Sequence, residues 1–357
     1  MQSEVQDEMR EIRGGAGTGR TRPRVLGMWG RALAMSALLI VAVASCRQPE
    51  PRSEEPFSAA PSSMSSGSLE KVRELLMGAD VAGRLEGFEM IEKLADPALL
   101  PELEEGMADG SEMIRKVCMS ALVELGEPAV PVLVRALEHA DWRVRNNAVV
   151  ALGHIKGASA IPLLKGMIGD AHERVRIATV KVMADIGGEE VAQLLIEHAA
   201  TQSPGVRIEI CKALGEIGTD NALRALPAFF TDANYGVRYY AAEAIARGGD
   251  GAVSYLVGVL ESSADVTARA LAARALGQTK SAQAVQPLVG ALEDPSSAVR
   301  RLAMWSLGNI GAWEARAALE AVQERGSCFE RRYAMYALDE INRSAFLETE
   351  TPVSKMY

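Results

Sequence analysis

The sequence predicts an all-α protein, an α-solenoid built from about nine helix-turn-helix repeats of 31 residues. Three observations predict this class. One arginine recurs at a nearly constant interval, and small and apolar residues follow it at helical spacing. Only 5% of the residues are aromatic, and the good helix formers Ala, Leu, Glu and Arg dominate the readable segments. A unit of this length cannot bury its own apolar face, so we expect successive units to stack on one another.

The recurring arginines fix the register of the repeats. They are separated by 31 residues seven times and by 30 residues once, which chance does not produce. These arginines are Arg84, Arg115, Arg145, Arg176, Arg207, Arg238, Arg269, Arg300 and Arg331. A Leu, Ile or Met stands seven positions after each one, and small residues such as Ala148 and Ala151 often stand three and six positions after it. At about 100° per residue these positions share one side of a helix, which we call helix B.

A second amphipathic stretch, helix A, precedes each helix B, as in "AIPLLKGMIG" at 160–169. An aspartate often stands in the turn between the helices, six residues ahead of the arginine, where its carboxylate can cap helix B. These aspartates are Asp109, Asp170, Asp232 and Asp294. Glycines near the ends of the B helices are expected to help terminate them. They are Gly126, Gly153, Gly187, Gly215, Gly218, Gly277 and Gly311.

The pattern of Asp, five residues, Arg and then A-x-x-A-L-G resembles the HEAT repeats of the phycobilisome-lyase-like kind. The resemblance covers residues 69–342 and derives its specificity from the register. It implies a right-handed superhelix whose concave side is lined by the B helices, with a ladder of Asp–Arg ion pairs along the stack. We assign this structural ladder to Asp170 with Arg176, Asp232 with Arg238, and Asp294 with Arg300. Thr201 and Ser263 replace the aspartate in two repeats, where we expect the ladder to be interrupted.

Residues 1–45 are predicted to be a leader and lipoprotein signal peptide. Their apolar run is too short for a membrane span of about 20 residues, and it ends in Val43-Ala44-Ser45-Cys46, which resembles the bacterial lipobox. The resemblance implies that Cys46 is lipidated and that the protein faces the periplasm or the exterior. Arg47 in place of an aspartate favours the outer membrane. The alternatives are an uncleaved anchor and an ordinary secretory signal.

The segments that flank the predicted solenoid differ from it in composition. Residues 46–68 are rich in Pro, Ser and Glu, which is typical of a disordered tether between the anchor and the folded repeats. Residues 343–357 are predicted to be a C-terminal tail.

Charge and cysteine content exclude several functions. The net charge is −9, whereas a nucleic-acid surface usually needs the opposite sign, so we expect no nucleic-acid partner. Cys118 and Cys211 fall on apolar helix positions and are predicted to be buried, unpaired thiols. There is no CxxC pair, and we expect no metal ion or other cofactor.

The sequence favours a protein that is not an enzyme. One enzyme built from similar repeats, deoxyhypusine hydroxylase, binds two irons through His-Glu pairs directly after the repeat arginine. Here the single such pair, His172-Glu173, precedes its arginine and cannot supply a two-iron site alone. An enzyme or enzyme subunit of the bilin-lyase or hydroxylase type remains the alternative, and no catalytic residue is assigned.

A candidate binding surface lies opposite the apolar side of helix B, at positions one, five, eight and nine after the arginine. In the last four repeats these positions are rich in Trp, Tyr and Arg, the residues that contribute most to protein interfaces. The predicted partner-binding residues are Tyr239, Glu243, Arg274, Arg301, Trp305, Asn309, Arg332 and Tyr336. They predict a monomeric scaffold that binds a protein or peptide on its concave face. In the alternative, Trp305 and the tyrosines pack on neighbouring repeats, or residues 343–357 cover the last helices.

Overall fold

The computed structural model describes residues 66–349 apart from residue 79, and these residues form an all-α solenoid, as the sequence predicts. The described part consists of α-helices and short 3₁₀-helices and contains no strand. The predicted signal peptide, Cys46, most of the predicted tether and the last residues of the chain lie outside the described residues.

Nine helices of the described part each carry one of the recurring arginines, and these are the B helices. They are α4 (Val81–Leu94), α6 (Glu112–Leu125), α8 (Trp142–Lys156), α10 (Glu173–Ile186), α12 (Pro204–Ile217), α14 (Tyr235–Ala246), α16 (Val266–Thr279), α18 (Ser297–Ile310) and α20 (Cys328–Thr349). The positions three and seven residues after the recurring arginine are buried as expected: Ala148, Leu152 and Leu276 are all 0% exposed. The nine-repeat register read from the sequence is therefore confirmed.

The A helices are shorter and more broken than the B helices. They are α3 (Ser66–Leu76), α5 (Leu100–Gly106), α7 (Val130–Ala136), α9 (Ile161–Leu164), α11 (Glu189–Ala199), α13 (Asp220–Ala225), α15 (Asp250–Ser262), α17 (Val285–Gly290) and α19 (Arg316–Arg325). Several contain a proline in the first turn, such as Pro131 and Pro162, and a separate 3₁₀ turn stands before them. Proline has no N–H to donate and its ring clashes with the preceding turn, so one continuous α-helix cannot form there.

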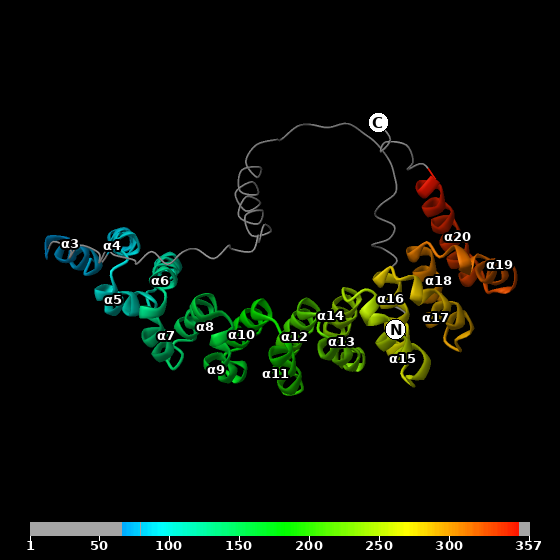
Figure 1. Cartoon of the computed structure of the whole chain (residues 1–357), viewed down its shortest axis with the longest axis horizontal. Helices are drawn as coiled ribbons and strands as arrows, with labels where there is room; N and C mark the ends of the chain where they lie inside the picture. Colours follow the sequence, from blue (N-terminus) through cyan, green and yellow to red (C-terminus); the bar gives the residue numbers. More distant parts are fainter. Residues whose placement is uncertain (1–65, 79, 350–357) are drawn as a thin grey trace, which may run out of the picture. The chain divides into compact units, whose positions relative to one another are not determined.

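The helices stack in chain order as two rows. Figure 1 shows the B helices on the inner side of the curve that residues 66–349 make, with the A helices on the outer side. Each B helix except α20 packs against the B helix of the next repeat, and most pack against the A helix of their own repeat. Helices α10 and α14 instead contact the 3₁₀ turns that follow α9 and α13, at Lys165–Gly169 and Leu226–Thr231. One continuous core of buried Leu, Ile, Val and Ala runs between the rows.

The glycines of the B helices have two different roles. Gly126, Gly187 and Gly311 have positive φ angles of 69°, 70° and 79° at the ends of their helices, where they terminate them as expected. Gly277 and Gly215 instead lie inside their helices, so their expected role as terminators is wrong. A Cβ atom on Gly277 would lie 2.4 Å from the Cβ of Ser306, so this glycine permits the close approach of α16 and α18.

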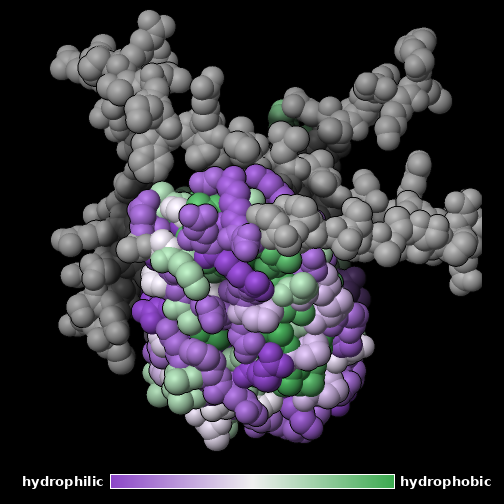
Figure 2. Space-filling model, turned by 90° about the vertical axis from the view of Figure 1, so that its left-hand side faces the viewer, coloured by the Kyte–Doolittle hydropathy of each residue, from purple (hydrophilic) through white to green (hydrophobic). Residues whose placement is uncertain are grey.

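The first and last helices reach past the predicted limits of the solenoid. Helix α3 begins at Ser66, and α20 continues to Thr349. Met335 of α20 is 49% exposed, although the equivalent Met304 of α18 is fully buried, because no further repeat packs on α20 in the described part. At the α3 end, Figure 2 shows hydrophilic side chains interspersed with apolar patches.

Two stretches of the described helices could cross a bilayer by length and composition alone. They are Trp142–Gly169 and the sharply bent pair Glu112–Leu125 with Glu127–Ala136. Core helices of proteins that never enter a membrane share this property, and both stretches contribute buried residues to the core of the stack.

Candidate functional site

The recurring arginines form ion pairs between neighbouring repeats. Arg145 in α8 donates from Nε to Oδ2 of Asp170 at 2.7 Å and from Nη2 to Oδ1 at 2.8 Å. Two parallel, charge-assisted hydrogen bonds of this kind fix the planar guanidinium against the carboxylate. The same arrangement joins Arg84 to Asp109, Arg207 to Asp232, and Arg269 to Asp294.

The ladder therefore exists, but its expected pairing within one repeat is wrong. Arg176 does not reach the carboxylate of Asp170 and instead donates from Nη1 to its main-chain oxygen at 2.7 Å. The turn places that oxygen, and not the carboxylate, within reach of the arginine six residues later. The corresponding main-chain bonds join Arg238 to Asp232 at 2.7 Å and Arg300 to Asp294 at 2.6 Å.

The aspartates also do not cap the first turn of helix B as expected. Oδ1 of Asp170 accepts the N–H of His172, at 2.7 Å, and His172 is itself the residue that caps α10. The carboxylate thus fixes the turn between the helices and binds the arginine of the preceding repeat. Each ladder aspartate is shared between two repeats.

The ladder aspartates stay charged because their hydrogen bonds outweigh their burial. Burial raises the pKa of Asp170, but the hydrogen bonds from Arg145 and from the N–H of His172 lower it by more than burial raises it. The pKa of Asp170 therefore lies below its ordinary value. The same balance lowers the pKa of the other ladder aspartates, Asp109, Asp232 and Asp294. The side chains of Arg145 and Asp170 are only 14% and 6% exposed, so water screens this pair less than an ordinary surface ion pair.

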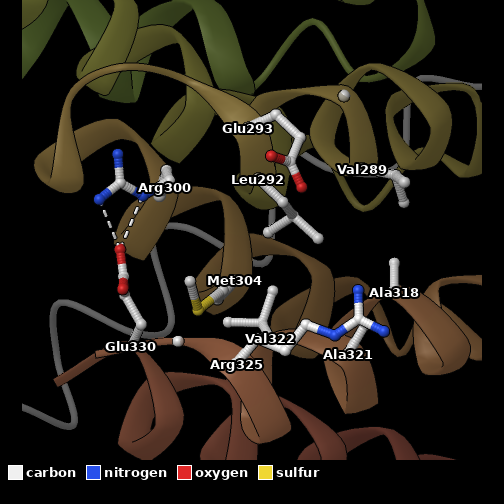
Figure 3. A pocket seen from close by; sticks show the side chains of 12 residues that line it. Val289, Leu292, Glu293, Arg300, Met304, Ala318, Ala321, Val322, Arg325 and Glu330 are labelled. Carbon is white, nitrogen blue, oxygen red and sulfur yellow. Dashed lines mark hydrogen bonds and ion pairs between the residues drawn. The ribbon is translucent and has the colours of Figure 1, made fainter. Parts of the chain in front are cut away.

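The last rung of the ladder uses a different carboxylate. Arg325 occupies the position of the ladder aspartate in the ninth repeat, and Glu330 in α20 binds Arg300 instead, with Nε 2.7 Å from Oε1 (Figure 3). Hydrogen bonds from Ser327 and from Arg300 lower the pKa of Glu330 to about 2. A groove of about 680 Å³ lies beside this pair, with Leu292, Met304 and Val322 among its lining residues (Figure 3).

Four of the predicted partner-binding residues are bound to one another or to neighbouring helices. Glu243 of α14 accepts hydrogen bonds from Arg274 at 3.0 Å and Gln278 at 2.6 Å, both in α16. The guanidinium of Arg274 also lies over the ring of Tyr239, 4.8 Å from its centre. Asn309 donates to the main-chain oxygen of Gly277 at 2.9 Å. Tyr239, Glu243, Arg274 and Asn309 thus link α14, α16 and α18.

The other four predicted residues, Arg301, Trp305, Arg332 and Tyr336, have free surface. Arg332 is exposed and Tyr336 is 46% exposed, whereas Arg301 and Trp305 are half-buried. Arg301 donates to the main-chain oxygen of Ser297 at 3.2 Å. Among the described residues, no carboxylate forms an ion pair with either arginine, so both positive charges remain uncompensated.

Sequence reasoning missed Phe329, which is 64% exposed in α20. Phe329, Arg332 and Tyr336 are three and then four residues apart, so they share one face of the helix. No signal in the repeat pattern marks Phe329, because it precedes the recurring arginine and lies outside the positions that the register assigns to the concave face. We call Arg301, Trp305, Phe329, Arg332 and Tyr336 the inner patch.

Within residues 66–349, the histidines and cysteines show no arrangement for metal chemistry. The described residues contain no group of three or more His, Cys, Asp or Glu side chains able to hold a metal ion. His172 stacks on Trp142, with ring centres 4.1 Å apart, and its Nδ1 accepts the N–H of Arg174. Cys118 and Cys211 are buried free thiols, as expected, and burial raises the pKa of Cys211 to about 12, which makes its reactive thiolate form rare.

The fold and the ladder define a solenoid of stacked helix pairs joined by ion pairs between repeats. Comparison with known families agrees with this class, since residues 100–175, 130–207, 162–246, 197–267 and 253–339 match the HEAT repeats. The chain therefore belongs to the HEAT-repeat family, which confirms the resemblance read from the sequence. No curated protein matches the chain.

The solved structures that match this chain have little sequence in common with it. Kap121p is 12% identical, with a TM-score of 0.53 over 81% of this chain and 39% of its own. The Escherichia coli protein YibA is 19% identical, with a TM-score of 0.42 over 72% of this chain and 95% of its own. Human deoxyhypusine hydroxylase is 20% identical, with a TM-score of 0.31 over 69% of this chain and 97% of its own. At 12% identity, the likeness to Kap121p concerns the fold alone.

Proposed function

We propose that this solenoid is a non-catalytic scaffold of the cell envelope that binds a protein or peptide partner on the inner patch. The observation that carries the proposal is the patch itself. It combines three aromatic side chains with two arginines that have no ion-pair partner in the described part of the chain. The core requires none of these residues at these positions.

The chemistry of the inner patch suits protein recognition. Trp, Tyr and Arg contribute most of the binding energy at many interfaces, because each combines a large contact area with a directed polar group. Helices α18 and α20 pack against each other and α18 is tied to α16 through Asn309, so the patch is held in place before a partner arrives. Kap121p, whose fold is similar, has been solved bound to Ste12p, which shows that such a fold can hold a protein ligand.

The proposed anchor rests on the sequence around Cys46. A lipid on this cysteine would attach the chain to the membrane, with the outer membrane favoured by Arg47. The Pro- and Ser-rich residues that follow would then separate the solenoid from the bilayer surface. A scaffold held in this way is restricted to partners in the periplasm or at the cell exterior.

The test is capture of the partner by a variant that lacks the inner patch. Arg301→Ala, Trp305→Ala and Tyr336→Ala together should reduce crosslinked partner from cell envelopes by at least about tenfold. The melting temperature should change little, because all three side chains keep contact with solvent. Trp313→Ala is the matched control, since Trp313 is 53% exposed on the outer row and lies outside the patch.

Two results would contradict the proposal. If the triple variant captures the same partner as the wild-type protein, the inner patch is not the binding surface. If mass spectrometry of the crosslinked material finds no partner for the wild-type protein, the solenoid acts as a spacer.

A further inference from the structure

We propose that the edge of the solenoid that carries the ladder is a second binding surface, which takes up the carboxylates of an acidic, extended protein segment. The inference goes beyond the inner patch. It rests on three arginines of the ladder, Arg115, Arg176 and Arg238, which alternate with the arginines that bind aspartate. We call their Nε and Nη2 groups the open forks.

The open forks lack the carboxylate that fills the equivalent forks. Arg145, Arg207 and Arg269 each hold an aspartate that stands 25 residues later, with Nε to Oδ2 distances of 2.7, 2.8 and 2.8 Å. The residues that stand 25 positions after Arg115, Arg176 and Arg238 carry no carboxylate. They are Ala140, Thr201 and Ser263, in that order. Throughout residues 66–349, no carboxylate forms an ion pair with these three arginines, and Nε of Arg176 is buried without any hydrogen-bond partner.

The open forks are held in place even without a carboxylate. Nη1 of Arg115 donates to the main-chain oxygens of Asp109 at 2.7 Å and Gly110 at 3.1 Å. Nη1 of Arg238 makes the same two bonds to Asp232 at 2.7 Å and Ala233 at 3.1 Å. The filled fork of Arg145 uses its Nη1 in the same way, so the turn sets the orientation of the guanidinium in both kinds of rung. An incoming carboxylate would therefore meet a preorganised site.

The acidic residues nearest in sequence to the missing carboxylates are engaged elsewhere. Oδ1 of Asp141 accepts the N–H of Arg143, and Oδ1 of Asp265 accepts the N–H of Ala268, each at 2.8 Å. Both aspartates cap their own helices. A hollow of about 380 Å³ lies beside Ser263 on the side of α13 and α15, and Arg238 is not among the residues that line it.

The spacing of the forks specifies the kind of ligand. Arg115, Arg176 and Arg238 are 61 and 62 residues apart, which is two repeats. At about 10 Å per packed helix layer, neighbouring open forks lie about 20 Å apart. An extended chain covers about 3.3 Å per residue, so a carboxylate about every sixth residue would match them.

The charge of the ladder favours the same ligand. Among the described residues, the ladder contains nine recurring arginines but only five carboxylates, which are Asp109, Asp170, Asp232, Asp294 and Glu330. Arginines therefore outnumber carboxylates along the ladder even when Asp80, Asp141 and Asp265, which lie near Arg84, Arg145 and Arg269, are added to the count, although the net charge of the chain is −9. An acidic segment is attracted to such an edge, whereas a basic one is repelled.

The experiment compares binding of an acidic peptide to the wild-type protein and to a variant in which aspartates introduced by substitution fill the open forks. The probe is a fluorescein-labelled peptide with a glutamate about every sixth residue in a Ser/Thr background, and its binding to the full chain is measured by fluorescence anisotropy at low salt. Ala140→Asp, Thr201→Asp and Ser263→Asp together should weaken binding by at least about tenfold and raise the melting temperature. Asparagine at the same three positions is the matched control without charge and should change the affinity by less than about twofold. The single variant Ser263→Asp, beside the hollow, provides the same comparison at one rung.

Three results would overturn the inference. They are equal affinity of the wild-type protein and the aspartate variants, an equal loss in the asparagine variant, and no binding of the peptide to the wild-type protein. The alanine variant of Arg301, Trp305 and Tyr336 keeps the open forks and should bind the peptide as the wild type does. A loss in that variant would move the peptide to the inner patch, which would overturn this inference and leave the proposed function intact.

Discussion

Glu330 shows how much a single carboxylate contributes at the end of the ladder. It accepts hydrogen bonds from the N–H and the hydroxyl of Ser327 at 2.8 and 2.6 Å and binds Arg300 as well. These bonds stabilise the charged form and lower the pKa of the carboxyl from 4.5 to about 2. The folded protein therefore binds this proton less tightly than the unfolded chain does.

The stabilisation by Glu330 should depend on pH. A folded-state pKa of about 2 against 4.5 in the unfolded chain means that the stabilisation is fully present above pH 4.5 and is lost as the pH falls towards 2. Glu330→Gln should therefore lower the melting temperature at neutral pH, and the gap to the wild type should narrow over this window. Melting curves followed by circular dichroism at a series of pH values would measure it.

Glu320→Gln is the control for this prediction. Glu320 forms an exposed ion pair with Arg316 in α19, and such pairs contribute little to stability. A gap between Glu330→Gln and the wild type that stays constant down to pH 2 would show that the charge of Glu330 is not what stabilises the fold.

At the same scale, the sequence identified the residues of the ladder but not their partners. The register shows which residues recur, whereas the partner of Arg176 depends on which atoms of the turn lie closest to it. The inner face shows the same limit. Tyr239 and Arg274 stand at the predicted positions, but only the packing of α14 against α16 shows that they bind each other.

At the scale of elements, the B helices were predictable and the internal breaks of the A helices were not. The B helices follow from strictly spaced apolar and small residues. In the A stretch at 160–169, apolar spacing predicts one helix, but the structure has the end of a 3₁₀ turn, the short α9 and a second 3₁₀ turn, and Pro162 accounts for the break before α9. The spacing of apolar residues carries no information about the backbone N–H that proline lacks, so it cannot locate such breaks.

The close packing of neighbouring B helices gives a prediction at this scale. Gly277→Val should lower the stability of the solenoid by about 1–3 kcal/mol, because the new Cβ would overlap Ser306 and separate α16 from α18. Urea unfolding followed by circular dichroism would measure the loss.

Gly258→Ala serves as the control for packing. Gly258 lies inside α15, and a Cβ there meets nothing within 4 Å. This substitution should leave stability unchanged or raise it by about 0.5–1 kcal/mol, since alanine favours a helix. Equal unfolding curves for Gly277→Val and the wild type would mean that the two helices do not need this glycine.

At the scale of the whole molecule, the stability of the stack comes from contacts between neighbouring repeats. Each described B helix has a B-helix neighbour on both sides except the first and the last. The sequence could establish this order, because the interval between the arginines is so regular. It could not show that Met335, which matches a core position elsewhere, would be exposed, since that depends on where the stack ends.

The proposed anchor gives a prediction for the whole chain in the cell. Cys46→Ala should move the protein from the membrane fraction to the soluble fraction, because the acyl chains would no longer be attached. Fractionation followed by immunoblotting would measure the shift, and Cys328→Ala is the control at an exposed cysteine of the solenoid. Unchanged membrane retention of the Cys46 variant would favour an uncleaved anchor.

The alternation of aspartate with Ala140, Thr201 and Ser263 has a consequence for how such a chain can change its length. Excising one repeat after Arg145 would bring this arginine opposite Thr201, and a filled rung would be lost. Excising two repeats would bring it opposite Asp232 and preserve the phase of every remaining rung. Between Arg84 and Asp294 the electrostatic unit of the ladder is thus a pair of repeats, and removing or inserting repeats there keeps the alternation only in even numbers.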